Sequence, residues 1–140
     1  NPVAIQCMVD LASRLETEGR RLCVLSAPGD RRDEDVAEIA KLAAEGEFAH
    51  IIVRRDDHPR GRDLDEIPNL LRRGLTESGY PEENITVIPD EQMAIHAGLE
   101  MAKRGDLLVI FGDQISRSWK QIVKFKENNE TDPSYYYYKR

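Results

Sequence analysis

The sequence predicts an α/β fold: a Rossmann-like, three-layer domain with a mostly parallel sheet and helices on both of its faces. Three observations support this prediction. Segments whose apolar residues recur at helical spacing alternate with short segments in which apolar residues run continuously. Continuous apolarity is typical of strands that are covered on both faces, as in parallel sheets. Glycine-containing turns separate the segments, so successive strands are expected to be connected through helices.

The first half of the chain contains two helix–strand pairs. A helix is predicted over residues 3–15 and ends before Gly19, and a strand follows over residues 21–27. A second helix over residues 33–45 leads to a second strand over residues 48–53. The first helix is expected to turn these residues inward: Val3, Cys7, Met8, Leu11, Ala12 and Leu15.

The second half continues the same alternation. A helix over residues 64–75 carries Pro68 in its first turn, where the missing N–H does no harm. A short strand over residues 85–88 precedes a helix capped by Asp90, and residues 107–111 form the most apolar strand. The last two helices are expected to pack through these residues: Met93, Ala94, Ala97 and Met101, then Trp119, Ile122 and Val123.

Length and charge limit the possible functions. We predict one α/β domain over residues 1–126 and a polar tail over residues 127–140 that is either disordered or in contact with another subunit. The formal net charge of −6 argues against nonspecific nucleic-acid binding, which needs a basic face. No apolar run approaches the ~20 residues that a membrane-spanning helix requires.

The cysteines and the start of the chain suggest where the protein works. Cys7 and Cys23 both stand in apolar, periodic settings, which predicts buried thiols and a reducing cytoplasm. The chain opens on Asn1 and Pro2 without a leader or an initiating Met. We therefore expect a piece of a longer protein, with part of the active site elsewhere.

The candidate site lies where the strands end. The first strand leads into the segment 26–35, which carries charges of both signs, the second leads into residues 54–60, and the last leads into residues 112–114. Ligands of open α/β sheets bind beyond the carboxyl ends of the strands, and these three segments share that edge. The crevice is expected to gather Asp30, Arg31, Asp57, Arg60, Asp113 and Gln114.

Mixed arginines and aspartates suit a zwitterion such as a free amino acid. A guanidinium pairs with a carboxylate through two parallel hydrogen bonds, and an aspartate accepts from an amine or a guanidinium. The alternative is a network of ion pairs on solvated loops, each contributing only ~0–1 kcal/mol. His58 lies in the same crevice and is a further candidate ligand.

Other chemistries lack their motifs. The chain has no Gly-x-x-x-x-Gly-Lys-Ser/Thr phosphate loop and no Gly-x-Gly-x-x-Gly after the first strand. His50, His58 and His96 are scattered and show no zinc-ligand spacing, so no metal site is predicted. Neither Ser26 nor Ser116 has a partnered base, which leaves nucleophilic catalysis without support.

Several strings resemble the C-terminal domain of the Mur ligase superfamily. These are Asn1-Pro2, the run from Ala27 to Asp35, Asp57-His58-Pro59-Arg60-Gly61-Arg62, and the run from Gly105 to Gly112. Within the superfamily, the run Ser26 to Asp35 is most similar to the cyanophycin synthetases. The resemblance covers about residues 1–126.

The resemblance implies a function. Mur ligases activate a carboxylate as an acyl phosphate with ATP and Mg²⁺, held mainly by a central domain that this chain lacks, and an incoming amino acid then attacks. It implies that Asp57, Arg60 and Arg31 contact that amino acid, that Gly112 to Gln114 reach it, and that Asn1 and Pro2 lie near the nucleotide. In cyanophycin synthetases, L-arginine is added to the β-carboxyl of poly-aspartate.

The sequence also departs from the family pattern. His58 replaces the usual Asn, and Asp113-Gln114 stands within what is Gly-Lys-Gly-His-Glu in some relatives. Three interpretations stay open: the amino-acid-binding lobe of a ligase that is inactive alone, a free-standing binding module, and an assembly domain whose crevice is an ion-pair network. The ligase lobe would have the ATP-binding central domain, an aspartate-containing acceptor and possible further copies of itself as partners.

Overall fold

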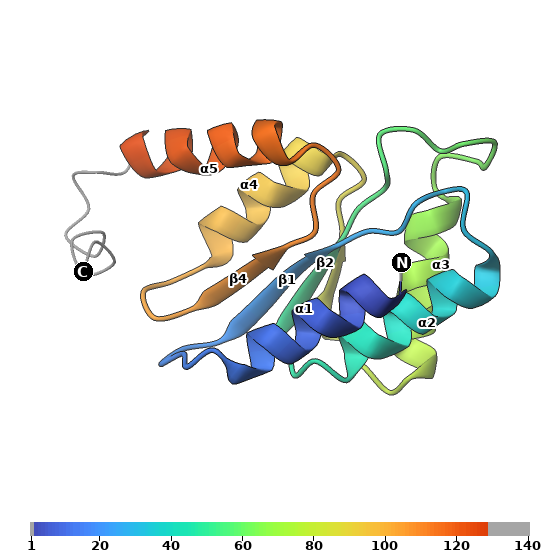
Figure 1. Ribbon diagram of the computed structural model, residues 1–140, viewed down its shortest axis with the longest axis horizontal. Coiled ribbons are helices and arrows are strands. Elements are labelled where there is room, and N and C mark those ends of the chain that lie inside the picture. Colours follow the sequence, from blue (N-terminus) through green and yellow to red (C-terminus); the bar gives the residue numbers. More distant parts are fainter. Residues whose placement is uncertain (1, 129–140) are drawn as a thin grey trace.

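The computed structural model describes residues 2–128, which form one four-stranded parallel sheet (Figure 1). The strands are β1 (Arg21–Leu25), β2 (His50–Val53), β3 (Ile85–Val87) and β4 (Leu107–Ile110). Their spatial order is β3-β2-β1-β4, and Cys23 of β1 lies between Ile51 of β2 and Val109 of β4. The predicted parallel sheet is confirmed.

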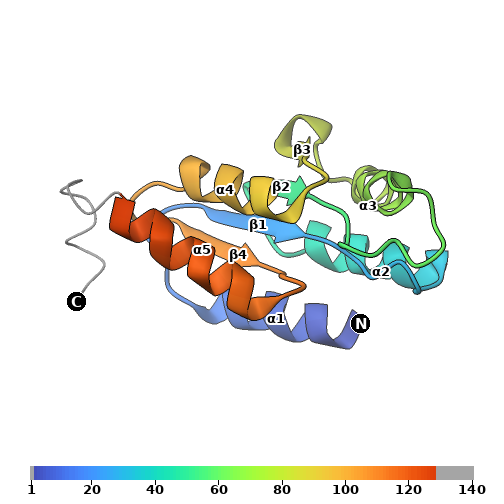
Figure 2. The same ribbon diagram turned by 90° about the horizontal axis from the view of Figure 1, so that it is seen from above.

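Helices cover both faces of this sheet, so the predicted three-layer architecture is also confirmed (Figure 2). One face carries α1 (Pro2–Arg14), α2 (Asp33–Ala44) and α3 (Glu66–Glu77). The other carries α4 (Glu91–Met101) and α5 (Ile115–Asn128). A 3-10 turn, η1 (Glu82–Asn84), leads into β3.

Alternation along β1 builds two cores. Successive strand side chains point to opposite faces, so Cys23 and Leu25 pack with α1, α2 and α3, whereas Val24 packs with Ala94 and Ile95 of α4. Burial raises the pKa of the Cys23 thiol far above its ordinary value. Asp90 caps the N-terminus of α4, because its side chain accepts a hydrogen bond from the Met93 N–H at 2.9 Å. The predicted cap is therefore confirmed.

The prediction of which α1 residues face the core is wrong. The helix buries Ile5, Val9 and Ala12, and of the expected set only Ala12 is buried. Two stripes of α1 are apolar, and the stripe next to α2 is the one that packs. These predicted core residues are exposed instead: Val3, Cys7, Met8, Leu11 and Leu15.

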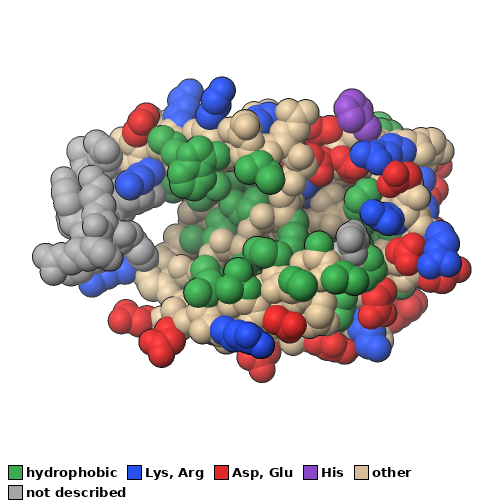
Figure 3. Space-filling view, viewed as in Figure 1, with side chains coloured by type: hydrophobic (Ala, Val, Ile, Leu, Met, Phe, Trp, Pro, Cys, Tyr) green, Lys and Arg blue, Asp and Glu red, His purple; other side chains and the backbone are tan. Residues whose placement is uncertain are grey.

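Two further packing predictions are wrong. Met93 is 65% exposed and Trp119 is 64% exposed, because α4 and α5 meet through other residues, among them Gln92 with Gln121 and Glu91 with Arg117. Leu64, the first residue of the helix predicted over residues 64–75, precedes α3 and is exposed. Figure 3 shows that exposed apolar side chains gather over α1 and α5 on one face, on either side of a hollow.

The ends of the predicted elements differ slightly from the observed ones. Pro68 is the third residue of α3, within its first turn as expected. The boundary drawn after residue 126 falls inside α5, which continues to Asn128. The expected tail from residue 129 onward lies outside the described residues. Across residues 2–128, no helix combines the length and the apolarity needed to cross a membrane.

Candidate functional site

Arg54 is the centre of the site and is a charged residue buried at the end of a strand. The sheet ladder continues past β2, because the Arg54 N–H donates to the Leu25 carbonyl at 2.9 Å. This pairing carries the Arg54 side chain under the first turn of α4, where 1% of it is exposed. A buried guanidinium requires charged and carbonyl partners, since an unpaired one would cost several kcal/mol.

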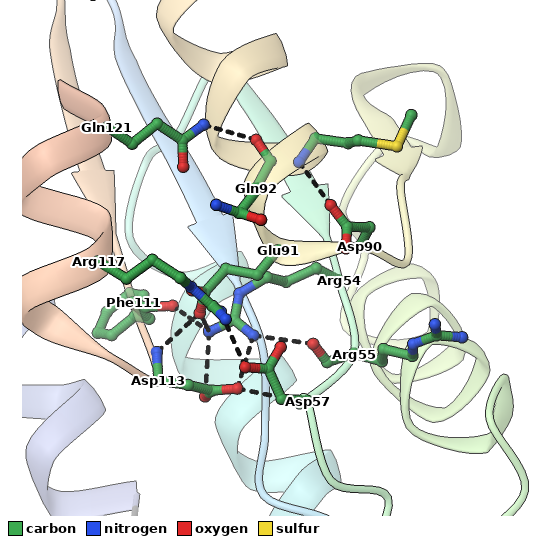
Figure 4. Close-up of polar contacts among 11 residues, drawn as sticks. Arg54, Arg55, Asp57, Asp90, Glu91, Gln92, Phe111, Asp113, Arg117 and Gln121 are labelled. Carbon is green, nitrogen blue, oxygen red and sulfur yellow. Dashed lines mark hydrogen bonds and ion pairs between the residues drawn. The ribbon is translucent and has the colours of Figure 1, made fainter. Parts of the chain in front are cut away.

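The partners of Arg54 come from three separate segments (Figure 4). Its Nη2 donates to the Phe111 carbonyl at 2.6 Å, and its two terminal nitrogens reach the two oxygens of Asp113, each at 3.2 Å. Nη1 also donates to the Arg55 carbonyl at 2.8 Å. Glu91, at the start of α4, completes the set with an ion pair at 3.1 Å.

A second arginine, Arg117 of α5, extends this arrangement outward. One nitrogen of Arg117 lies 2.5 Å from Glu91 Oε1 and 2.8 Å from Asp57 Oδ2. Glu91 is 1% exposed, whereas 29% of the Asp57 side chain is exposed. Two backbone N–H groups also connect these residues: the Asp113 N–H donates to the Glu91 carboxylate, and the Asp57 N–H donates to the Asp113 carboxylate.

The carboxyl groups of Asp56 and Asp113 lie close together and interact through a hydrogen bond when Asp56 is protonated. Burial raises the pKa of Asp56 to about 6, and the contact with Asp113 adds to that shift. Burial alone would also raise the pKa of Asp113. The hydrogen bonds from Asp56, Arg54 and the Asp57 N–H outweigh this effect and lower the pKa of Asp113 to about 2.

Arg60 and Asp30 form the outer edge of the site. Arg60 pairs with Asp30 at 2.7 Å, and both side chains are about half exposed, at 49% and 53%. The guanidinium of Arg60 also lies 3.9 Å from Asp56, which links this pair to the buried group. Arg60 has a φ of 52°, a left-handed conformation that costs a non-glycine residue about 1 kcal/mol or more.

Close packing joins the loops that follow β1 and β2. A side chain at Gly29 would place its Cβ 2.2 Å from the Pro59 carbonyl oxygen, so only glycine fits there. Arg62 donates to the Gly29 carbonyl at 2.9 Å and to the Arg31 carbonyl at 2.6 Å. The same guanidinium pairs with Asp33 at 2.8 Å, and these contacts hold Asp30 next to Arg60.

The predicted site residues fall into two groups. Contacts join Asp30 to Arg60 and Asp57 to Asp113, so the expected meeting of three loops is present. The side chains of the other three predicted residues are exposed and outside these contacts: Arg31, His58 and Gln114. Pro2 begins α1, and Asn1 lies outside the described residues.

Sequence reasoning missed Arg54, Glu91 and Arg117 as members of the site. The sequence holds one indication of Arg54. This residue directly follows a continuous apolar strand, so its side chain is at a position where burial is expected to continue. Glu91 follows the residue that caps α4, and Arg117 stands four residues after Asp113. Neither position indicates that its side chain turns toward β2.

The described residues do not supply a metal site of their own. Across residues 2–128, no group of three or more His, Cys, Asp and Glu side chains is arranged to hold a metal ion. The carboxylates of Asp57, Glu91 and Asp113 each pair with an arginine instead. This donor set therefore does not fit a magnesium ion.

The fold and the site together define a class. This is a parallel α/β domain that gathers paired arginines and carboxylates beyond the carboxyl ends of its strands, the edge at which open α/β sheets bind their ligands. The family described as "Mur ligase, glutamate ligase domain" matches residues 1–114, and the chain belongs to that family.

Curated relatives support the same family. The chain is 43% identical over 106 residues to the cyanophycin synthetase of Nostoc sp., a match that covers 76% of this chain and 12% of the relative. It is 38% identical over 113 residues to that of Geminocystis herdmanii, covering 81% and 13%. It is 33% identical over 122 residues to that of Synechocystis sp., a match that covers 87% of this chain and 14% of the relative. The chain thus spans about one eighth of these relatives.

Solved structures share the fold. A UDP-N-acetylmuramoyl-L-alanyl-D-glutamate–2,6-diaminopimelate ligase superposes with a TM-score of 0.69 at 21% identity, covering 89% of this chain and 28% of the other. E. coli FolC in complex with ADP gives a TM-score of 0.65 at 19% identity, covering 92% and 28%. At these identities the likeness concerns the fold alone.

Proposed function

We propose that this chain is the amino-acid-binding lobe of an ATP-dependent amide ligase of the cyanophycin synthetase type. In this proposal, L-arginine is joined to the β-carboxyl of an aspartate-containing acceptor that has been activated as an acyl phosphate. ATP and Mg²⁺ are held by a central domain outside these residues, and the isolated lobe is inactive. The family membership and the similarity to cyanophycin synthetases support the ligase class.

The observation that carries the proposal is an excess of carboxylate at the solvent side of the site. Two guanidinium groups, Arg54 and Arg117, face three carboxylates, those of Asp57, Glu91 and Asp113. Of these three carboxylates, Glu91 is buried, and the two at the surface are Asp57 and Asp113. A site with surplus negative charge favours an amino acid whose side chain is a cation.

The Asp30–Arg60 pair offers the opposite charge. Both partners are half exposed, so the contact between them is weak and an incoming carboxylate can replace Asp30 on the guanidinium. We assign the α-carboxylate of the amino acid to Arg60 and its side-chain cation to Asp57. These contacts would place the α-amine for attack, so the contribution of the lobe is positioning rather than proton transfer.

Binding tests this assignment. Isothermal titration of the complete natural polypeptide with L-arginine should show affinity at least about tenfold weaker for Asp57→Asn and for Arg60→Ala, the loss of one charged contact. The matched control is Arg72→Ala, which removes a half-exposed arginine paired with Glu82 elsewhere on the surface. Its affinity should equal that of the natural sequence.

Two results would count against the ligase proposal. Unchanged arginine affinity in both Asp57→Asn and Arg60→Ala would remove the assigned binding site. Tight arginine binding without any ATP-dependent amide formation would instead support a non-catalytic binding module.

A further inference from the structure

We propose that Arg54, Glu91 and Arg117 are positioning residues of the amino acid site, which fix the Asp57 carboxylate and leave one of its oxygens for the substrate cation. This inference rests on the proposed function, because it assigns roles within the same site. It also separates two carboxylates, Asp57 and Asp113, that the sequence alone leaves equivalent.

Protein donors take up most of the acceptor capacity of Asp113. Arg54 donates to both of its oxygens at 3.2 Å, and the Asp57 N–H donates to Oδ2 at 3.0 Å. A carboxylate has about four lone-pair sites, so these three donors leave Asp113 little room for a ligand. Below pH about 6 the protonated Asp56 carboxyl adds a fourth contact. The role of Asp113 is to hold Arg54 and the backbone of Asp57 in place.

Asp57 has more free acceptor capacity than Asp113. Contacts among the described residues engage only its Oδ2, which lies 2.8 Å from Arg117, and 29% of the side chain is exposed. The remaining oxygen can accept from an ammonium or a guanidinium group. Because Arg117 is itself held by the buried Glu91 at 2.5 Å, the carboxylate of Asp57 is fixed rather than free to rotate.

This network is costly for a purely structural element. The Arg54 and Glu91 side chains are each 1% exposed. Removing a charged pair from water often costs as much free energy as the attraction between the two charges provides. Well-packed apolar residues would stabilise the same contact between β2 and α4 as effectively. The network instead ties the loops after β2 and β4 to the first turns of α4 and α5 (Figure 4), which sets where the Asp57 carboxylate stands.

Arg117→Ala tests the inference, since this side chain is 32% exposed and its loss leaves no buried charge on α5 itself. In the complete polypeptide, kcat should fall about tenfold or more because displacement of a positioned group by ~1 Å costs up to 10²-fold, while the KM for the amino acid changes less than about threefold. Arg117→Lys, which keeps the cation, should recover part of kcat. Arg72→Ala is the control.

Amide hydrogen exchange gives a readout that does not depend on activity. In the 140-residue chain, Arg117→Ala and Glu91→Gln should each lower the protection of the Asp57 and Asp113 amides about tenfold, while the Val24 amide in β1 is unchanged. An equal loss at Val24 would indicate a purely structural role and overturn the inference. Unchanged protection at Asp57 and Asp113 would overturn it as well.

The two proposals fail in different ways. If Asp57→Asn weakens arginine binding but Arg117→Ala leaves kcat unchanged, the positioning role is wrong and the proposed function stands. If both Asp57→Asn and Arg60→Ala leave arginine affinity unchanged, the proposed function fails, and amide exchange still decides whether Arg117 fixes Asp57.

Discussion

Asp56 and Asp113 make the site sensitive to pH in a way that follows from their surroundings. The pKa of Asp56 is about 6 in the folded chain against an ordinary value of 3.8, so the folded state binds its proton more tightly and stability falls as pH rises from about 4 to 6. The pKa of Asp113 is about 2, so its contribution is lost as pH falls from about 4 to 2. Together the pair is most stabilising near pH 4.

Asp56→Asn should therefore stabilise the folded chain at neutral pH. An amide keeps a hydrogen-bond donor toward Asp113 without a charge to bury, and we expect a gain of about 1–2 kcal/mol at pH 7 and none at pH 4. Urea unfolding of the 140-residue chain at both pH values measures this difference. Asp63→Asn, at an exposed carboxylate, is the control and should show no such pH dependence.

Gly29 is required by a close approach of two loops. Gly29→Ala places a methyl group against the Pro59 carbonyl oxygen and should cost about 1–3 kcal/mol as the loops move apart. The matched control is Gly98→Ala in α4, where the added Cβ meets side-chain atoms of Leu108 and Val24 at 3.2 Å. Chemical denaturation measures the free energy of unfolding of both variants. If Gly29→Ala were as stable as the natural sequence, the close approach of the two loops would not require glycine.

Among the elements, α4 has the clearest link between its local sequence and the site. Asp90 caps its first turn, and the next residue, Glu91, holds Arg117 and the Asp113 N–H. A frayed first turn would therefore loosen the network as well as the helix.

Asp90→Ala should destabilise the chain by about 1 kcal/mol, whereas Asp90→Asn, which keeps an acceptor for the Met93 N–H, should cost only a few tenths. Denaturant unfolding measures both. Exchange of the Asp113 amide should quicken in Asp90→Ala alone. If the two variants behave alike, the cap does not support the site.

The helices and strands could be predicted because their apolar spacing is regular, but the facing of some helices could not. In α1 the stripe through Leu11 and the stripe through Val9 are both apolar, and only packing against α2 decides between them. In α5, Trp119 looks like a core residue in sequence, yet the helix buries Ser118 and leaves Trp119 exposed.

For the molecule as a whole, the meeting of three loops was predictable because parallel strands end at one edge of the sheet. This argument brought Asp57 and Asp113 together, which the structure bears out with a 3.0 Å hydrogen bond. The buried partners were not predictable. Glu91 and Arg117 reach the site from helices on one face of the sheet, and their orientation depends on how those helices dock.

The most direct test of the central claim is ATP-dependent joining of L-arginine to poly-aspartate by the complete natural polypeptide, comparing the natural sequence with Asp57→Asn and Arg72→Ala. The proposed function predicts amide formation by the natural sequence and by Arg72→Ala. It predicts a loss of at least about tenfold in kcat/KM for Asp57→Asn, equivalent to about 1.4 kcal/mol of transition-state stabilisation. Equal activity of Asp57→Asn and the natural sequence, or no ATP-dependent product from the natural sequence, would contradict it.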